Sequence, residues 1–312
     1  MADVKKIATR ESYGNALKDL AEEFPQLVVL DADLAGATKT GIFKKAYPDR
    51  HIDCGIAESN MMGIAAGLSL TGKIPFASSF AMFAAGRAFE QVRNSIGYPH
   101  LNVKIGATHA GLTVGEDGAS HQCNEDIALM RTIPGMVVMC PSDDIEAKAA
   151  VRAALEHVGP VYIRFGRAAV PVINDRPDYK FEIGKGQIVR EGKDVTIVAT
   201  GIMVDSALQA AEKLAADGID AEVINICTIK PLDKDIIVNS AKKTGKVVTC
   251  EEHSVIGGLG SAVCDALAEE YPVKVKKIGM QDVFGESGSA AALVAKYGLD
   301  AEGVYKSVKA FL

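Results

Sequence analysis

Short apolar runs alternate with helix-length segments along almost the whole chain. Parallel strands cannot be joined by a tight hairpin, so a crossover helix must return the chain to the same edge of the sheet. We therefore predict an α/β fold of two parallel or mostly parallel sheet domains, with helices on both faces of each sheet. The predicted strands lie at residues 27–30, 51–54, 74–77, 102–108, 136–141, 161–165, 194–201, 221–226, 246–250 and 273–278.

A local change in composition divides the chain into two parts. A length of 312 residues is typical of about two domains. Prolines, asparagine and aspartates, which favour turns and loops, gather in residues 171–186. We predict a first domain at residues 1–170, a linker at 171–186 and a second domain at 187–312.

Charge, hydropathy and cysteine spacing exclude several classes of protein. The formal net charge of −6 disfavours a nucleic-acid-binding surface. No stretch approaches the ~18 apolar residues of a membrane span, and the N-terminus lacks the apolar core of a signal peptide. The six cysteines show no paired spacing, and we interpret them as buried free thiols of a reducing compartment. We therefore expect a soluble, cytoplasmic protein that binds neither nucleic acid nor membrane.

A single acid, Glu58, stands between a short apolar strand and the helix predicted at residues 59–70. That helix is apolar or small on every side, so it must be buried in a large core or against another subunit. An acid at such a position is costly unless it is paired or used. Desolvation raises the pKa of a carboxyl group, which suits proton transfer. The structural alternative is a first-turn charge that the helix dipole stabilises.

The glycine-rich loop at residues 109–122 follows a predicted strand and contains two of the six histidines, His109 and His121. Catalytic groups concentrate on such loops, and a neutral imidazole can bind a sugar hydroxyl. A structural loop is one alternative. A metal site at His109, Asp117 and His121 is another, but this spacing matches no common metal motif.

Two further pairs of side chains have both structural and functional interpretations. Phe80 and Phe83 would share one face of a predicted helix that runs to Arg93, where they could belong to the core or stack on a flat heteroaromatic ring. Arg164 and Arg167 follow a strand, where guanidinium groups suit a phosphate. A solvated surface pair is the alternative for these arginines.

Three motifs together resemble the transketolase family, at residues 55–61, 115–122 and 133–143. The resemblance covers essentially the whole chain, but only the pyrimidine-binding and C-terminal domains of the full enzyme. It implies dependence on thiamine diphosphate. By this resemblance Glu58 bonds the aminopyrimidine ring and favours its imino tautomer, and Phe80 and Phe83 stack on that ring.

The resemblance also implies the contacts to the substrate. His109 and Asp117 match contacts to substrate hydroxyls and to the intermediate, and His121 matches a sugar or phosphate contact. Arg167 matches a phosphate-binding arginine, and Arg164 fits that role less well. Glu58, His109 and His121 are therefore the catalytic candidates. A second family arginine would fall near residues 39–41, where this chain has none.

Half of the family's cofactor site is missing from the sequence. The family holds the diphosphate and Mg²⁺ with a Gly-Asp-Gly motif and a downstream asparagine, and this chain contains no Gly-Asp-Gly. The resemblance therefore implies a split transketolase, in which an N-terminal subunit supplies the diphosphate and metal half. The expected assembly is a heterotetramer that transfers a two-carbon ketol unit between sugar phosphates, from a ketose to an aldose.

Three alternatives remain open at this point. One is the beta subunit of a 2-oxoacid dehydrogenase, although the loop from His109 to His121 is closer to transketolase. Another is an enzyme similar to deoxyxylulose phosphate synthase, which shares the Asp117-Gly118 and His121-Gln122 pattern. The third is a non-catalytic protein with a relict site.

Overall fold

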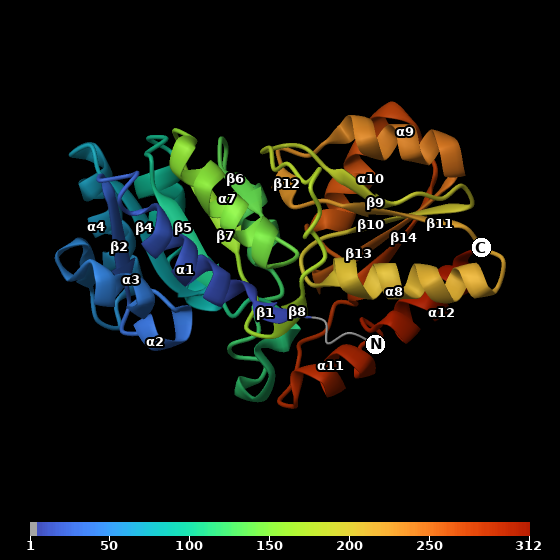
Figure 1. Cartoon of the computed structure of the whole chain (residues 1–312), viewed down its shortest axis with the longest axis horizontal. Coiled ribbons are helices and arrows are strands. Elements are labelled where there is room, and N and C mark those ends of the chain that lie inside the picture. Colours follow the sequence, from blue (N-terminus) through green and yellow to red (C-terminus); the bar gives the residue numbers. More distant parts are fainter. Residues whose placement is uncertain (1–4) are drawn as a thin grey trace.

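Two sheets, each covered by helices on both faces, account for most of residues 5–312, which this computed structural model describes (Figure 1). The sheets stand side by side along the long axis of the molecule. Strand neighbours within each sheet run parallel except at one edge. The predicted α/β fold with mostly parallel sheets is therefore confirmed.

The first sheet has seven strands, and one of them comes from the second half of the chain. Its short edge strand β12 pairs antiparallel with β6, whereas the other neighbours are parallel. No strand was predicted at the position of β12. In spatial order the strands are β12 (Thr228–Lys230), β6 (Val137–Met139), β7 (Val161–Arg164), β5 (Lys104–Thr108), β4 (Ile74–Phe80), β2 (Leu27–Asp31) and β3 (His51–Asp53).

Alternate residues of β2 explain how this sheet is covered. Leu27 and Val29 face one apolar cluster with α1 and α7, whereas Val28 and Leu30 face another with α4 and α6. Strands with apolar residues on both faces are typical of parallel sheets buried between helices. The helices of this unit are α1 (Thr9–Leu20), α2 (Ala35–Thr38), α3 (Gly41–Ala46), α4 (Glu58–Leu70), α5 (Phe89–Gln91), α6 (Asp126–Arg131) and α7 (Asp144–Glu156).

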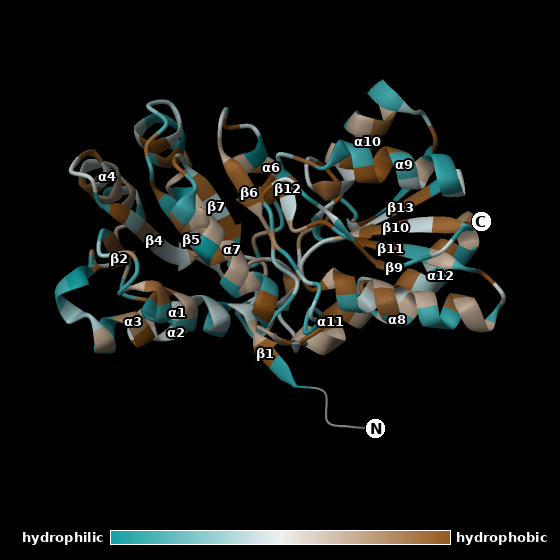
Figure 2. Cartoon of the chain, turned by 45° about the horizontal axis from the view of Figure 1, so that its top comes forward, coloured by the Kyte–Doolittle hydropathy of each residue, from teal (hydrophilic) through white to brown (hydrophobic). Residues whose placement is uncertain are grey.

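The second sheet has five strands, and its antiparallel edge strand is β9. Helices α8 and α12 cover one face, and α9 and α10 cover the other (Figures 1 and 2). The strands in spatial order are β14 (Lys274–Met280), β13 (Lys246–Ser254), β10 (Val195–Ala199), β11 (Ala221–Asn225) and β9 (Gln187–Arg190). The helices are α8 (Met203–Ala216), α9 (Lys234–Thr244), α10 (Leu259–Glu270), α11 (Ala290–Lys296) and α12 (Ala301–Phe311).

A short antiparallel pair lies where the two units meet. Strand β1 (Lys6–Ala8) precedes α1 and pairs with β8 (Ala169–Pro171), which follows the first sheet. Within residues 5–312, no helix is long and apolar enough to span a membrane.

The segment after β4 differs from the single regular helix that we predicted. Phe80 is the last residue of β4, and the chain then forms η2 (Met82–Arg87), α5 and η3 (Val92–Gly97). The η segments have wide turns, in which the amide of Ala88 donates to the carbonyl of Phe83, five residues earlier. Phe80 and Phe83 therefore do not share one helix face, and their proximity has a different origin.

Helix α4 is buried on one side only within this chain. Met61, Met62 and Ala65 pack against the sheet. The opposite side is exposed, and a Cβ added at Gly63 or Gly67 would meet no atom within 4 Å. The burial on all sides that we predicted is therefore not reached within a single chain.

Candidate active site

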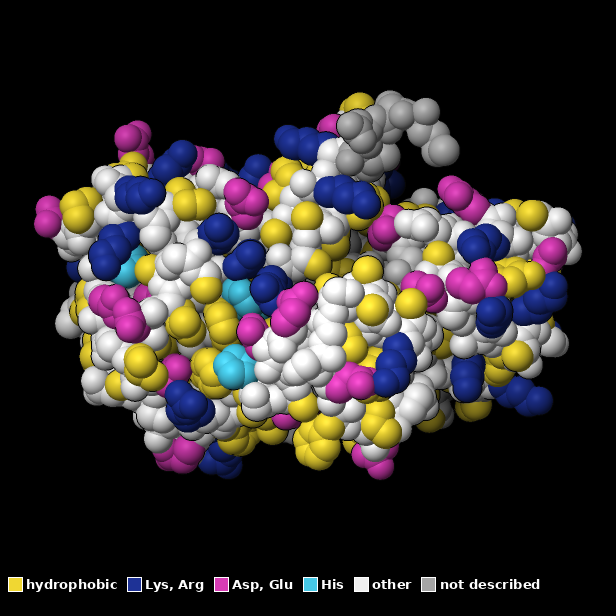
Figure 3. Space-filling view, turned by 90° about the horizontal axis from the view of Figure 1, so that it is seen from below, with side chains coloured by type: hydrophobic (Ala, Val, Ile, Leu, Met, Phe, Trp, Pro, Cys, Tyr) yellow, Lys and Arg dark blue, Asp and Glu magenta, His cyan; other side chains and the backbone are white. Residues whose placement is uncertain are grey.

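The carboxyl ends of neighbouring strands bring the predicted site residues to one edge of the first sheet. Strand β4 ends at Phe80, β5 ends immediately before His109, and the turn after β3 leads to Glu58 at the start of α4. Open parallel sheets bind ligands at this edge. The face of the molecule in Figure 3 shows histidine side chains among basic, acidic and apolar ones.

Aromatic rings from separate segments stack at this edge. The ring centroid of His109 lies 3.9 Å from that of Phe80, and the two rings are nearly parallel. Phe80 in turn lies nearly parallel to Phe83, with centroids 5.8 Å apart. The ring of His121 stands edge-on to Phe83 at 5.4 Å. Together these four predicted site residues form a surface that could receive a flat ring.

Glu58 lies beside this aromatic surface. Its side chain is only 2% exposed, and Nη1 of Arg87 donates to its Oε2 at 2.9 Å. The guanidinium of Arg87 also covers the Phe83 ring, 4.5 Å from the centroid. Arg87 was not singled out from the sequence, although its position one turn after Phe83 is a local signal for such a contact.

The tautomer of His109 follows from its neighbours. Arginine has no acceptor, so the 3.2 Å contact from Nη1 of Arg10 requires that Nε2 of His109 accept. The proton then lies on Nδ1, which can donate to Oγ1 of Thr108 at 2.9 Å. Burial, and next the charges of Arg10 and Arg167, lower the pKa of His109 to about 3. His109 is thus a neutral imidazole with a fixed orientation at physiological pH.

Arg10 is a second residue at this edge of the sheet that was not singled out from the sequence. It comes from the first turn of α1 and donates to the carbonyl of Ala37 at 2.9 Å, just before the segment at residues 39–41 where no family arginine was found. Burial, and next the charge of Arg167, lower its pKa. The charges of Arg10, Arg167 and Lys39 all act on His109. Three cations are therefore near enough to His109 to affect its charge, and such a group could bind an anion.

Asp117 lies at the rim of this cationic group. Its carboxylate is 3.8 Å from Nη1 of Arg167, and that of Glu116 is 3.3 Å from the same atom. Arg167 also donates to the carbonyl of Val114. These contacts join the loop after β5 to the segment after β7, so Asp117 and Arg167 are neighbours.

Arg164 lies in a structural position. It is neither at a phosphate site nor part of a solvated surface pair, the two interpretations that the sequence allowed. Its side chain is 5% exposed, so it is not solvated, and its Nε donates to Oδ2 of Asp126 at 2.9 Å. Its Nη2 donates to the carbonyls of Cys123 and Glu252. Because Glu252 lies on β13, Arg164 links the two units and is not free to bind a phosphate.

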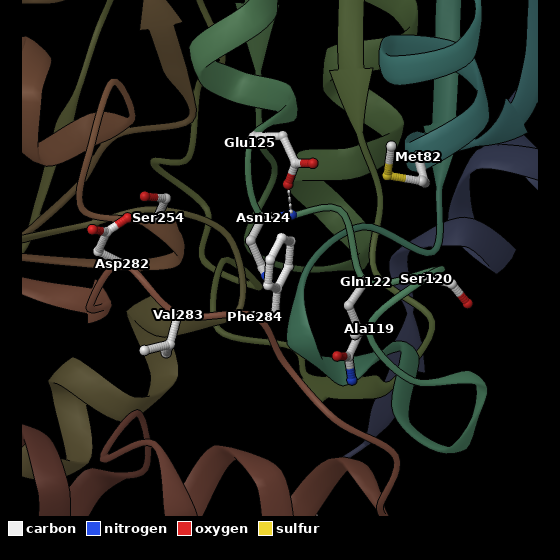
Figure 4. Close-up of a pocket in the computed structure, with 10 residues that line it drawn as sticks. All are labelled: Met82, Ala119, Ser120, Gln122, Asn124, Glu125, Ser254, Asp282, Val283 and Phe284. Carbon is white, nitrogen blue, oxygen red and sulfur yellow. Dashed lines mark hydrogen bonds between the residues drawn. The ribbon is translucent and has the colours of Figure 1, made fainter.

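A cavity of about 410 Å³ adjoins the site at the boundary between the two units. In Figure 4, Asp282, Val283 and Phe284 approach from the second unit, and Met82 and Gln122 line the side of the first unit. The cavity lies beside the aromatic surface and not on it, because neither Glu58 nor Phe83 lines it. Its lining residues are Met82, Ala119, Ser120, Gln122, Asn124, Glu125, Ser254, Asp282, Val283 and Phe284.

The part of the chain from residue 5 onward holds no group of three or more His, Cys, Asp or Glu side chains that could bind a metal ion. In particular, Asp117 pairs with Arg167, and His109 contacts Arg10. The metal-loop alternative for His109, Asp117 and His121 is therefore not supported by their geometry.

Both parts of the chain match known families. Residues 5–172 match the transketolase pyrimidine binding domain, and residues 184–304 match the transketolase C-terminal domain. A protein of Methanocaldococcus jannaschii that is provisionally named a transketolase C-terminal section is 52% identical over 301 residues, which are 96% of this chain and 94% of that protein. The 6-deoxy-6-sulfo-D-fructose transketolase subunit SqwH of Clostridium sp. is 46% identical, over 96% of this chain and 92% of that subunit.

Similar solved structures indicate how much of the enzyme this chain represents. A structure described as a split gene transketolase, in an inactive beta4 tetramer, matches with a TM-score of 0.89 and 56% identity over 98% of both chains. Human transketolase is 37% identical over 98% of this chain, but the match covers only 49% of the human protein. The chain is thus similar to nearly all of a split-gene protein and to about half of an undivided one.

Proposed function

The chain belongs to the transketolase family, and from this premise we propose that it is the C-terminal subunit of a two-subunit transketolase. Together with an N-terminal partner, it transfers a two-carbon ketol unit from a ketose phosphate to an aldose phosphate. The observation that carries this proposal is the buried carboxylate of Glu58 beside the face of Phe83.

The residues of this chain fit the aminopyrimidine ring of thiamine diphosphate. When bound, this cofactor supplies the electron sink that cleavage of a carbon–carbon bond needs. Glu58 has the carboxyl group that could hold a proton at a ring nitrogen, and Phe83 and Phe80 offer the flat surface. Because Glu58 is removed from water, its hydrogen bond to a ring would be stronger than one at the surface.

The cationic group supports an anionic substrate. The charges of Arg10, Lys39 and Arg167 act on His109, which Arg10 also contacts, and its neutral ring could bind a sugar hydroxyl. Arg10 compensates for the arginine that was missing from residues 39–41. We propose that these cations bind the phosphate of the sugar and that His109, His121 and Asp117 contact its hydroxyls. The name of SqwH specifies a sulfonated sugar, so the anionic group of the substrate differs in that relative.

We propose that the other half of the site comes from a partner. Residues 5–312 offer no group of side chains that could bind a metal ion. Human transketolase is about twice as long, and its match to this chain covers only 49% of the human protein. We propose that the N-terminal subunit holds the diphosphate and Mg²⁺, and that two chains of each kind form a heterotetramer. The exposed side of α4 is the surface that such a partner would cover. The related beta4 tetramer is described as inactive, which agrees with dependence on a partner.

Reconstitution with a partner tests the proposal. The chain alone, with thiamine diphosphate and Mg²⁺, should show no ketol transfer, and addition of a subunit that carries Gly-Asp-Gly and a downstream asparagine should restore it. Glu58→Gln in the complex should lower kcat by at least ~100-fold, because a positioned proton carrier is lost. Glu90→Gln, an exposed acid on α5, is the matched control. Robust activity of the lone chain would contradict the split site.

The same assay separates the alternatives. A ketose phosphate should serve as the donor. Turnover with pyruvate as the donor, and not with a ketose phosphate, would favour a 2-oxoacid dehydrogenase or a synthase similar to deoxyxylulose phosphate synthase. If Glu58→Gln leaves turnover unchanged, a relict site is the better description.

A further inference from the structure

We propose that Arg87 is a positioning residue. Its guanidinium binds Glu58 and occupies the place that the aminopyrimidine ring must take. Cofactor binding then requires that Arg87 leave. This inference rests on the proposed function, because it assigns the ring to Glu58 and Phe83. It adds Arg87, which was not among the predicted site residues, and it requires that Arg87 leave Glu58 before the ring can bind there.

The contacts of Arg87 are those that the ring would need. Its guanidinium is flat, it lies 4.5 Å above the centroid of Phe83, and it donates to Oε2 of Glu58 at 2.9 Å. An aminopyrimidine is also flat and carries donors at its edge. Phe80 is stacked beside Phe83 and His121 stands against its edge, so the face that Arg87 covers is the one a further ring could take once Arg87 has left.

The difference in burial between the two partners shows which of them can move. Glu58 is 2% exposed, whereas the side chain of Arg87 is 52% exposed. A buried carboxylate that loses its partner keeps the full cost of desolvation, but a half-exposed guanidinium can turn into water.

The consequence is an exchange of partners at Glu58. In the free chain Arg87 protects the buried acid, and it can be released only when another donor replaces it. The chain is thus stable without cofactor, and the apparent affinity for cofactor is reduced because the competent arrangement, with Arg87 displaced, is a minor population.

Direct binding measurements on the assembled complex test this exchange. Calorimetric titration with thiamine diphosphate in the presence of Mg²⁺ should give a Kd for Arg87→Met that is about tenfold lower than for the natural chain, because the competing state is removed. The matched control is Arg93→Met, an exposed arginine of the same segment, whose Kd should not change. Equal or weaker binding by Arg87→Met would overturn the inference, because it would mean that Arg87 stays on Glu58 when the ring is bound.

A second measurement does not depend on a variant. The Nη1–H signal of Arg87, the group that donates to Glu58, should be protected from solvent exchange in NMR spectra of the complex without cofactor and should lose that protection when thiamine diphosphate binds. Protection that persists after binding would overturn the exchange. Failure of the proposed function gives a different result, in which the natural complex does not bind thiamine diphosphate or Glu58→Gln leaves binding and turnover unchanged.

Discussion

Arg10 stands in the first turn of α1, where the helix dipole disfavours a cation. It is retained there beside His109 and the carbonyl of Ala37, which it reaches across a long separation in sequence. An unfavourable local charge of this kind indicates a use elsewhere in the structure. We interpret that use as recognition of the anionic end of the substrate.

Replacement of Arg10 tests this interpretation in the complex. Arg10→Gln should raise the KM for a phosphorylated ketose by roughly tenfold to a hundredfold, because one charge-assisted hydrogen bond is lost, and should change kcat little. A donor without an anionic group should be unaffected. Lys18→Gln, an exposed cation in the last turn of the same helix, is the control. Equal losses for both donors would assign Arg10 to orientation of His109 only.

At the scale of elements, a buried ion pair joins β7 to α6 and β13. Arg164 and Asp126 are 5% and 0% exposed, and the hydroxyl of Tyr162 also donates to Asp126 at 2.8 Å. The Nη2 of Arg164 donates to the carbonyl of Glu252 on the second sheet at 2.8 Å. The carboxyl edge of the first sheet is therefore held against the second unit by hydrogen bonds that water cannot replace.

Loss of one partner should destabilise this junction. Arg164→Met leaves Asp126 as an uncompensated buried charge and should lower the free energy of unfolding by about 3–5 kcal/mol, measured by urea denaturation of the free chain. The double variant Arg164→Met/Asp126→Asn should recover part of this loss, because the amide is neutral and still accepts from Tyr162. A loss below about 1 kcal/mol for the single variant would mean that the pair contributes little.

On the scale of the whole molecule, one apolar cluster runs through both units. It includes Val138 of β6, Ile229 of β12 and Val247 of β13. Because β12 extends the first sheet from within the second half of the chain, the two units share a core and a sheet edge. Their relative position is fixed by packing, and this holds the loops at their boundary in place.

The exposed side of α4 is the surface that we propose is covered on assembly. Asn60, Gly63, Gly67 and Leu70 form a stripe, and Leu70 is 76% exposed. Gly67→Glu should leave the stability of the free chain unchanged or slightly raised, because its side chain would meet no atom and glycine disfavours helices. In the complex it should reduce the mass measured by light scattering below that of a heterotetramer, because the added charge would be buried at an interface.

The control for this prediction is Val158→Glu. Val158 lies outside α4 and is 77% exposed, about as much as Leu70 of the stripe. Val158→Glu should leave the heterotetramer intact. If Gly67→Glu also assembles normally, α4 is not part of the interface.

The sequence by itself determined most of the longer strands and helices. Apolar runs with helices between them predicted two mostly parallel sheets, and the helix predicted after Glu58 is α4, which begins at Glu58 itself. These features depend on local periodicity, which each segment carries whatever its neighbours are. The motifs of the loop at residues 109–122 likewise indicate the family through the order of their residues alone.

Only the tertiary structure decided which side chains meet. The sequence could not place Arg10 against His109, Arg87 over Phe83, or Arg164 inside an ion pair. It also could not show that β12 completes the first sheet, or that Phe80 ends a strand. Such contacts depend on strand order and register, which arise from packing over the whole chain and leave no periodic trace in any one segment.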